Sequence, residues 1–226
     1  MKKAVIFTDD SGVKLPEIHK WKHVLGKGND IKNNPMFLDA LKKASLYIPE
    51  GDIGVEDRYR KALREFIRPA LLMFAGMFGE IRIFYNVLKE ILPTELYIVS
   101  GRYGIVREDD EIIPYSAHIK NIEDLEKLNS RTKFVNTMFE ASKDNCFIIM
   151  CFPSYYFQYL INEGWFERFG NEHLFFIVTG VKIKSKLSSY PTINMFEKRG
   201  VARIGRDYQM EIIDRIKSKI KFEMKS

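Results

Sequence analysis

Four apolar runs, separated by stretches of amphipathic pattern, dominate the chain. They lie near residues 3–8, 95–99, 145–151 and 173–179, and each is short, continuous and rich in β-branched or aromatic side chains. Such runs are typical of strands buried on both faces of a sheet, because a half-exposed strand alternates apolar and polar residues. Between them, apolar positions recur every three or four residues, which predicts helices. The alternation predicts a three-layer α/β domain with a mostly parallel central sheet.

The helical pattern covers six segments. They are residues 35–46, 55–78, 79–92, 121–143, 153–163 and 207–222. In the second of them we expect a break or kink near Pro69, since proline cannot donate a backbone hydrogen bond. Residues 9–34 read as a long polar loop, and residues 181–206 as a basic loop with short strands at 192–196 and 201–204. We expect one domain over residues 1–226, because neither repeats nor linker-like stretches occur.

The apolar run at residues 95–99 leads directly into a glycine-bracketed loop. The loop residues are Ser100, Gly101, Arg102, Tyr103 and Gly104. Glycines permit positive φ angles and close approach of the backbone to a ligand. The planar guanidinium group of arginine can donate two hydrogen bonds to a phosphate or a carboxylate. Ligands of open α/β sheets bind beyond the carboxyl ends of the strands, so we expect these residues to contact a ligand. The alternative is an ordinary turn with an exposed arginine.

This loop, an acidic spacer and the segment 112–115 together resemble the signature of the YaaA-like proteins. That family includes the peroxide-stress YaaA proteins and small uncharacterised phage and prokaryotic relatives. The matching positions are Ser100, Gly101, Tyr103, Gly104, Pro114 and Tyr115. The chain departs from the pattern just afterwards, where it has Ser116-Ala117-His118 and many relatives have a charged residue. The resemblance covers residues 96–115 and implies an α/β domain associated with nucleic-acid protection and base metabolism.

Positive charge is concentrated in the segment 181–206. The whole chain has a formal net charge of +6, and this segment alone has seven basic residues against one acid. Clustered basic residues with aromatic residues between them are typical of a surface that binds a polyanion, because contacts to phosphate supply much of the affinity for nucleic acid. The alternative is a solvated lysine-rich surface. We expect the segment to be exposed, with these candidate nucleic-acid contacts: Lys182, Lys184, Lys186, Arg199 and Arg203.

Asp9, Asp10 and His118 are the candidate catalytic residues. Both aspartates follow the first strand directly, where a carboxylate can act as a base or bind a metal. Histidine exchanges protons near neutral pH. The competing interpretations are that an aspartate caps a turn and that His118 has only a structural role. We expect no cofactor and no metal, because no spacing typical of metal ligands occurs.

The candidate groups come from separate strand ends and, with Tyr115, Tyr155 and Thr179, should converge on one crevice. There, tyrosines would stack a base, Arg102 would meet a phosphate, and an aspartate would act as acid or base. We therefore favour a nucleic-acid- or nucleobase-directed protein, with catalysis on a base or its glycosidic bond left open. The alternatives are a non-catalytic DNA- or RNA-binding protein that uses residues 181–206, and a metal-dependent nuclease or small-molecule nucleotide enzyme.

Several classes of protein are excluded by missing motifs. Walker, dinucleotide-binding, nucleophile-elbow and zincin motifs do not occur. Cys146 and Cys151 share one predicted strand, where a rise of about 3.3 Å per residue keeps them too far apart for a disulfide. We expect buried, structural thiols. Because no apolar stretch approaches about 20 residues and Lys2-Lys3 precede only a short apolar run, we expect a cytoplasmic protein without membrane contact.

Overall fold

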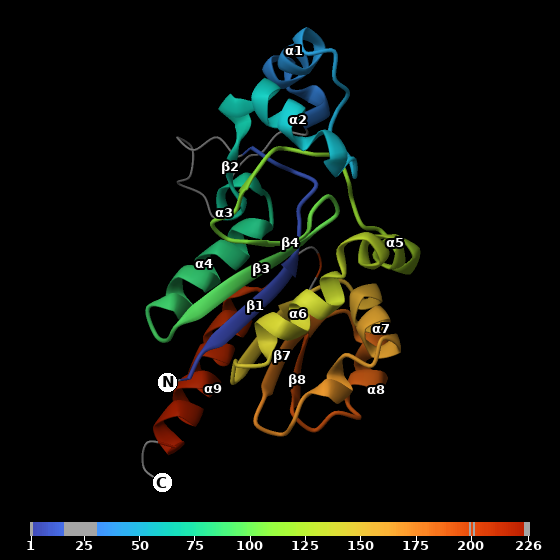
Figure 1. The fold of residues 1–226 in the computed structure, drawn as a ribbon. Coiled ribbons are helices and arrows are strands. Elements are labelled where there is room, and N and C mark those ends of the chain that lie inside the picture. The colour runs from blue at the N-terminus through green and yellow to red at the C-terminus, as the bar shows by residue number, and fades with distance from the viewer. Residues whose placement is uncertain (1, 16–30, 199, 201, 224–226) are drawn as a thin grey trace.

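A six-stranded sheet forms the centre of the computed structural model, which describes residues 2–15, 31–198, 200 and 202–223 (Figure 1). The strand order is β4-β3-β1-β6-β7-β8. The strands are β1 (Ala4–Asp9), β3 (Thr94–Ser100), β4 (Gly104–Arg107), β6 (Phe147–Cys151), β7 (Leu174–Thr179) and β8 (Ile193–Glu197). Only β4 is antiparallel to its neighbour in this sheet. The predicted α/β class with a mostly parallel sheet is therefore confirmed.

Helices cover both faces of the sheet and make it the middle of three layers (Figure 1). One face carries α4 (Phe78–Lys89) and α9 (Arg206–Glu223). The other carries α5 (Ile122–Thr132), α6 (Phe134–Ser142), α7 (Ser154–Asn162) and α8 (Lys184–Leu187), with short turns η5 (Phe166–Arg168) and η6 (Val181–Ile183). Ala4 and Ile6 of β1 belong to the core under the first face, and Val5 and Phe7 to the core under the second. All four are fully buried, which explains the unbroken apolar run.

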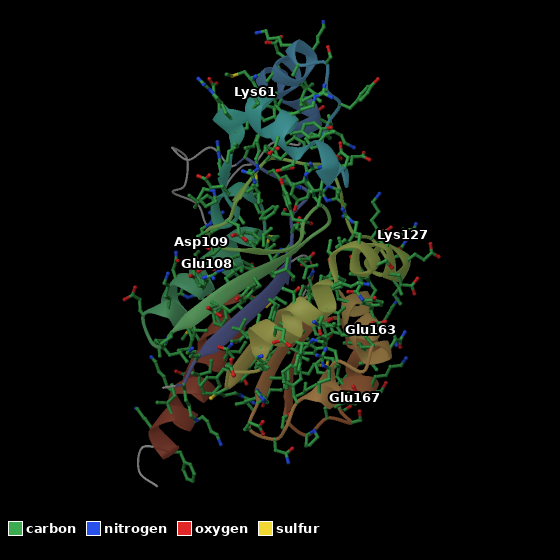
Figure 2. All side chains as sticks on the ribbon, viewed as in Figure 1. Lys61, Glu108, Asp109, Lys127, Glu163 and Glu167 are labelled. Carbon is green, nitrogen blue, oxygen red and sulfur yellow. The ribbon has the colours of Figure 1, made fainter. Side chains whose placement is uncertain are left out.

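Residues 31–69 form a small helical lobe, called the lobe below, beyond the carboxyl ends of β1 and β3 (Figure 1). It contains η2 (Ile31–Asn33), α1 (Pro35–Lys43), η3 (Ile53–Val55), α2 (Glu56–Ala62), η4 (Arg64–Phe66) and β2 (Arg68–Pro69). The Asn34 side chain caps α1 by accepting a hydrogen bond from the Phe37 N–H (3.1 Å). Figure 2 shows Lys61 on this lobe and Glu163 on the body that surrounds the sheet.

Two predicted helices are broken in the structure. The expected helix at 55–78 ends with α2, and the break expected near Pro69 is confirmed: Arg68 and Pro69 are extended and pair with β5 (Glu111–Ile112) before α3 (Ala70–Met73) begins. Proline restricts both itself and the preceding residue, which favours this extended pair. The expected helix at 121–143 divides into α5 and α6 at Lys133, whose φ of 56° is left-handed.

The basic segment is more ordered than expected. The predicted strand at 192–196 is present as β8 and joins the sheet as its parallel edge strand. No strand forms over the described part of 201–204, because Glu80 of α4 accepts the backbone N–H groups of Arg203 (2.7 Å) and Ile204 (2.9 Å). Most of the predicted polar loop, residues 16–30, lies outside the described residues. Among those described, no helix has the length and apolar character needed to cross a membrane.

Candidate functional site

The connections of the sheet diverge at the carboxyl ends of β1 and β6. β1 has β3 on one side and β6 on the other, so the chain reverses its direction of travel across the sheet at this point. Such a switch point leaves a crevice in which α/β proteins bind their ligands. A cavity of about 350 Å³, called the wide compartment below, opens here. Its polar lining comes from Asp9, Ser11, Lys198 and Arg203.

Arg203 holds Asp9 in place at the carboxyl end of β1. Its Nη1 donates to Thr8 Oγ1 (2.9 Å) and to the Asp9 carbonyl (2.8 Å), and it forms an ion pair with the Asp9 carboxylate. Its Nη2 donates to the Asp10 carbonyl (2.7 Å). The Asp9 side chain is 22 % exposed and that of Arg203 is 12 % exposed. Burial raises the pKa of Asp9, and the Arg203 charge opposes this shift. A carboxyl group with a raised pKa is better matched to proton transfer near neutral pH.

Lys198 enters the same crevice from the end of β8. Its backbone N–H donates to the Thr179 carbonyl (2.7 Å), which fixes the start of its side chain at the end of β7. In the described part of the chain, its ammonium group has no hydrogen bond or ion pair. A second cavity of about 110 Å³, called the narrow compartment, shares Val178, Lys198 and Arg203 with the wide one. Asp207 and Tyr208 complete its polar lining.

The glycine-bracketed loop forms a buried hydrogen-bond network beside the crevice. Ser100 Oγ donates to the Tyr115 hydroxyl (2.7 Å), which donates to Asp10 Oδ2 (2.6 Å). Gly101 N–H donates to the same carboxylate oxygen (3.2 Å), and Ser100 Oγ accepts the N–H groups of Arg102 (3.2 Å) and Tyr103 (3.0 Å). Burial and the charge of Asp10 raise the pKa of Tyr115 well above its ordinary value, so it stays a donor. Asp10, Ser100 and Tyr115 therefore hold the loop in place.

The predicted stacking of a base on Tyr115 is wrong. The Tyr115 residue is fully buried, and its ring packs against Phe74 and Tyr103 with the Lys14 ammonium 4.4 Å from its centre. No face of the ring is left for a ligand. The signature tyrosine thus serves the packing of the loop.

The predicted phosphate contact of Arg102 is also wrong. Arg102 is fully buried, and its guanidinium donates to Glu56 Oε2 (2.7 Å from Nη2) and to Asp52 Oδ1 (2.7 Å from Nη1). Burial lowers the pKa of Arg102, but these hydrogen bonds outweigh that effect and the pKa lies above its ordinary value. Tyr103 donates to the other Glu56 oxygen (2.7 Å). Both side chains therefore attach the loop to the lobe.

Two glycines of the loop are required by its geometry. Gly104 has a φ of +85°, which disfavours any residue with a side chain. At Gly101, a Cβ atom would lie 2.5 Å from the Ala117 carbonyl oxygen, so the two backbones approach too closely for another residue. The expectation of positive φ and close backbone approach in this loop is confirmed.

The remaining predicted site residues surround the crevice without lining it. His118 is exposed and its ring lies over Gly12, about 3.5 Å from where a Cβ would stand there. Partial burial and the nearby charge of Lys14 lower the pKa of His118. The Tyr155 hydroxyl donates to the Ile119 carbonyl (2.9 Å). Thr179 is buried, and its hydroxyl has no hydrogen-bond partner among the described residues.

The predicted nucleic-acid contacts separate into two groups. Lys182 and Lys184 are exposed on η6 and α8, and Lys186 is exposed with its ammonium donating to Gln158 Oε1 (2.5 Å). Arg203 faces the crevice, so the expectation of an exposed Arg203 is wrong. Arg199 lies outside the described residues.

Several groups at the crevice were not identified from the sequence. Phe152 and Val178 both line the crevice. Phe152 directly follows one apolar strand and Val178 lies near the end of another, so their position along the chain is a usable signal. Glu80, which orients the backbone of Arg203, gives no such signal because 123 residues separate the two. Cys151 also lines the wide compartment, but burial raises the pKa of its thiol to about 12, which keeps it protonated.

Neither a metal cluster nor a relative identifies the site. Within the described ranges, no group of three or more His, Cys, Asp or Glu side chains is placed to hold a metal ion. Comparison of the chain with models of protein families, with curated proteins and with solved structures finds no match. The resemblance to YaaA-like proteins therefore rests on the signature residues alone.

Proposed function

We propose that the crevice binds a nucleobase-bearing ligand and that the protein acts on the base or its glycosidic bond. The observation that carries this proposal is the position of Asp9. It is a partly exposed carboxyl group with a raised pKa, at the switch point of the sheet and beside two cations. Sites of this kind, a concave surface with perturbed titratable groups, are where α/β proteins place their chemistry.

Asp9 suits the hydrolysis of a glycosidic bond. Positive charge develops on the sugar ring as this bond breaks, and a nearby carboxylate stabilises that charge. Alternatively, the carboxylate takes a proton from the water that adds to the anomeric carbon, the bond to the base breaks, and the departing base takes up a proton from solvent. Arg203 fixes the orientation of Asp9 in either role. Val178, which lines both compartments, supplies apolar contact for the flat ring of the base.

The size of the crevice limits the ligand to a single nucleotide unit. A volume of about 350 Å³ lies at the lower end of the range for small-molecule sites. A stacked duplex does not enter such a cavity, so a base in nucleic acid would have to be extruded or single-stranded. Free nucleosides and nucleotides enter directly.

The decisive experiment is a search for base release that depends on Asp9. Nucleosides, nucleotides and single-stranded oligonucleotides are incubated with the protein, and products are identified by chromatography and mass spectrometry. We expect Asp9→Asn to lower the rate by about 10²–10⁴-fold, the usual contribution of an acid–base group. The control is Asp144→Asn, because Asp144 is an exposed aspartate just before β6, at the opposite edge of the sheet. Turnover that survives Asp9→Asn, or no change in any of these compounds, would contradict the proposal.

A non-catalytic role in nucleic-acid binding is the second candidate. The exposed position of Lys182, Lys184 and Lys186 on one short stretch, η6 and α8, favours it. Phosphate contacts of this type give affinity without chemistry. Polyanion binding that depends on these lysines and not on Asp9 distinguishes this role from the first.

A further inference from the structure

The two cations of the crevice are not equivalent. Arg203 is engaged by Thr8, Asp9 and Asp10 at the end of β1, and its charge offsets that of Asp9. Lys198 is only partly exposed, and its ammonium group meets no acceptor within the described ranges. The charge of Lys198 acts on Asp9 through space, without a direct ion pair. The wide compartment thus has two cationic side chains, Lys198 and Arg203, and one carboxyl group, Asp9, which favours an anionic ligand group.

Lys198 is also held in a fixed position. It follows Glu197, which pairs with Thr179 in the register of β7 and β8. Its own N–H donates to the Thr179 carbonyl (2.7 Å). The side chain thus starts from the end of a sheet strand, and a site on a rigid element loses less freedom when a ligand binds.

Val178, Lys198 and Arg203 line both compartments, which differ in their other side chains. The wide compartment adds the polar Asp9 and Ser11 and the apolar Phe152. The narrow compartment has the apolar side chains of Val178 and Ala202 and the ring of Tyr208, which packs on Phe196 with 5.2 Å between ring centres. Asp207 adds a carboxylate that accepts hydrogen bonds. This arrangement matches a ligand with an anionic group next to a flat ring that carries N–H donors.

We infer that the ligand is a nucleotide whose phosphate group binds Lys198 in the wide compartment and whose base edge enters the narrow compartment against Tyr208 and Asp207. This inference rests on the proposed function and narrows its substrate class from nucleobase compounds to phosphorylated ones. A lysine ammonium is a common phosphate ligand in proteins. The phosphate also explains why Lys198 faces the crevice while the other lysines of the basic segment face solvent.

The test compares affinities for matched ligands with and without phosphate. Isothermal titration calorimetry measures the binding of nucleosides, their 5′-monophosphates, ribose 5-phosphate and inorganic phosphate. We expect the wild-type protein to prefer the monophosphate over the nucleoside by about tenfold or more, which equals about 1.4 kcal/mol. Lys198→Gln should remove this preference while nucleoside binding persists, and Lys198→Arg should retain most of it. Lys127→Gln is the control, since Lys127 is an exposed lysine on α5, away from the crevice and from the basic segment.

The outcomes separate this inference from the proposed function. Equal wild-type affinity for nucleoside and monophosphate, or a preference that survives Lys198→Gln, overturns the inference and leaves the proposed function standing. Lys198-dependent binding of ribose 5-phosphate or phosphate, with no contribution from any base, supports the phosphate site and overturns the proposed function. If neither nucleobase compounds nor phosphates bind, both are overturned. Thermal unfolding of each variant confirms that the compared proteins are folded.

Discussion

Two opposing effects act on the pKa of the Asp9 carboxyl group. Burial raises its pKa and the adjacent Arg203 guanidinium lowers it, with burial the larger effect. We therefore expect a titration midpoint above the ordinary aspartate value of 3.8. Arg203→Gln removes the lowering effect and should move the midpoint still higher. Carbon-detected NMR of the side-chain carboxyl groups measures both midpoints, and the spectrum of Asp9→Asn assigns the signal.

The same shift predicts the sign of a stability change with pH. Since the pKa of Asp9 is higher in the folded protein than in the unfolded chain, the folded protein binds more protons between the two values. The contribution of Asp9 is complete below pH 3.8 and is lost as the pH rises through the folded-state value. Urea unfolding of Asp9→Asn should lack this component of the pH dependence. A wild-type midpoint at or below 3.8 would contradict both the raised pKa and this pH dependence.

At the scale of elements, Arg102 connects the loop after β3 to the lobe. Its guanidinium is fully buried and donates to Glu56 and Asp52. Arg102→Gln removes the donor of Glu56 Oε2, while Tyr103 and Arg60 still contact the other oxygen of this partly buried carboxylate. Loss of buried hydrogen bonds to a charged group typically lowers the free energy of unfolding by about 1.5–3 kcal/mol. Urea denaturation measures the loss, and hydrogen exchange should show it as faster exchange in α2.

Arg107→Gln is the matched control for Arg102→Gln. Arg107 ends β4, its side chain is 48 % exposed, and its ion pair with Asp109 is long at 3.6 Å. Exposed pairs of this kind contribute under about 1 kcal/mol. Equal losses for the two variants would show that the loop does not depend on the buried arginine. Unchanged exchange in α2 would show that the lobe is held by other contacts.

The elements differ in how well the sequence predicts them. β1, β6 and β7 could be predicted because a strand buried on both faces is mostly apolar, and β3 because residues 96–99 form an apolar run; both are local properties. The pairing of Arg68 with Ile112 depends on a contact across the fold, whereas the break at Lys133 is a local left-handed turn within an otherwise helical pattern. The pattern of neighbouring residues along the chain does not indicate such contacts.

The same distinction applies to the candidate site. Asp9 could be found from its position after the first strand, because strand ends collect at one edge of the sheet. For Arg102 the sequence predicts a ligand contact, because it shows a loop arginine but not its partners Asp52 and Glu56, which lie 50 and 46 residues away. The pairing of Arg203 with Asp9 spans 194 residues and joins two ends of the chain. Only the folded arrangement reveals it.

At the scale of the whole molecule, the basic segment contributes to two different surfaces. Lys198 and Arg203 face the crevice, whereas Lys182, Lys184 and Lys186 face solvent. A net charge of +6 gives nonspecific attraction to polyanions, but attraction alone does not locate the contact surface. The two surfaces can be tested separately because they share no side chain.

Reversal of Lys182, Lys184 and Lys186 to glutamate tests the solvent-facing surface. We expect weaker DNA binding, and the slope of log affinity against log salt should fall by about 0.9 for each duplex phosphate that the variant no longer binds. Turnover of a free nucleotide should not change, because none of the three lines the crevice. Fluorescence anisotropy across a salt series measures the slope. Reversal of Lys61, Lys89 and Lys127, exposed lysines elsewhere, is the control for net charge, and Figure 2 shows Lys61 and Lys127 on the lobe and on α5. Equal slopes for the two triple variants would mean that affinity follows net charge alone, whereas a loss of turnover would mean that η6 and α8 belong to the active crevice.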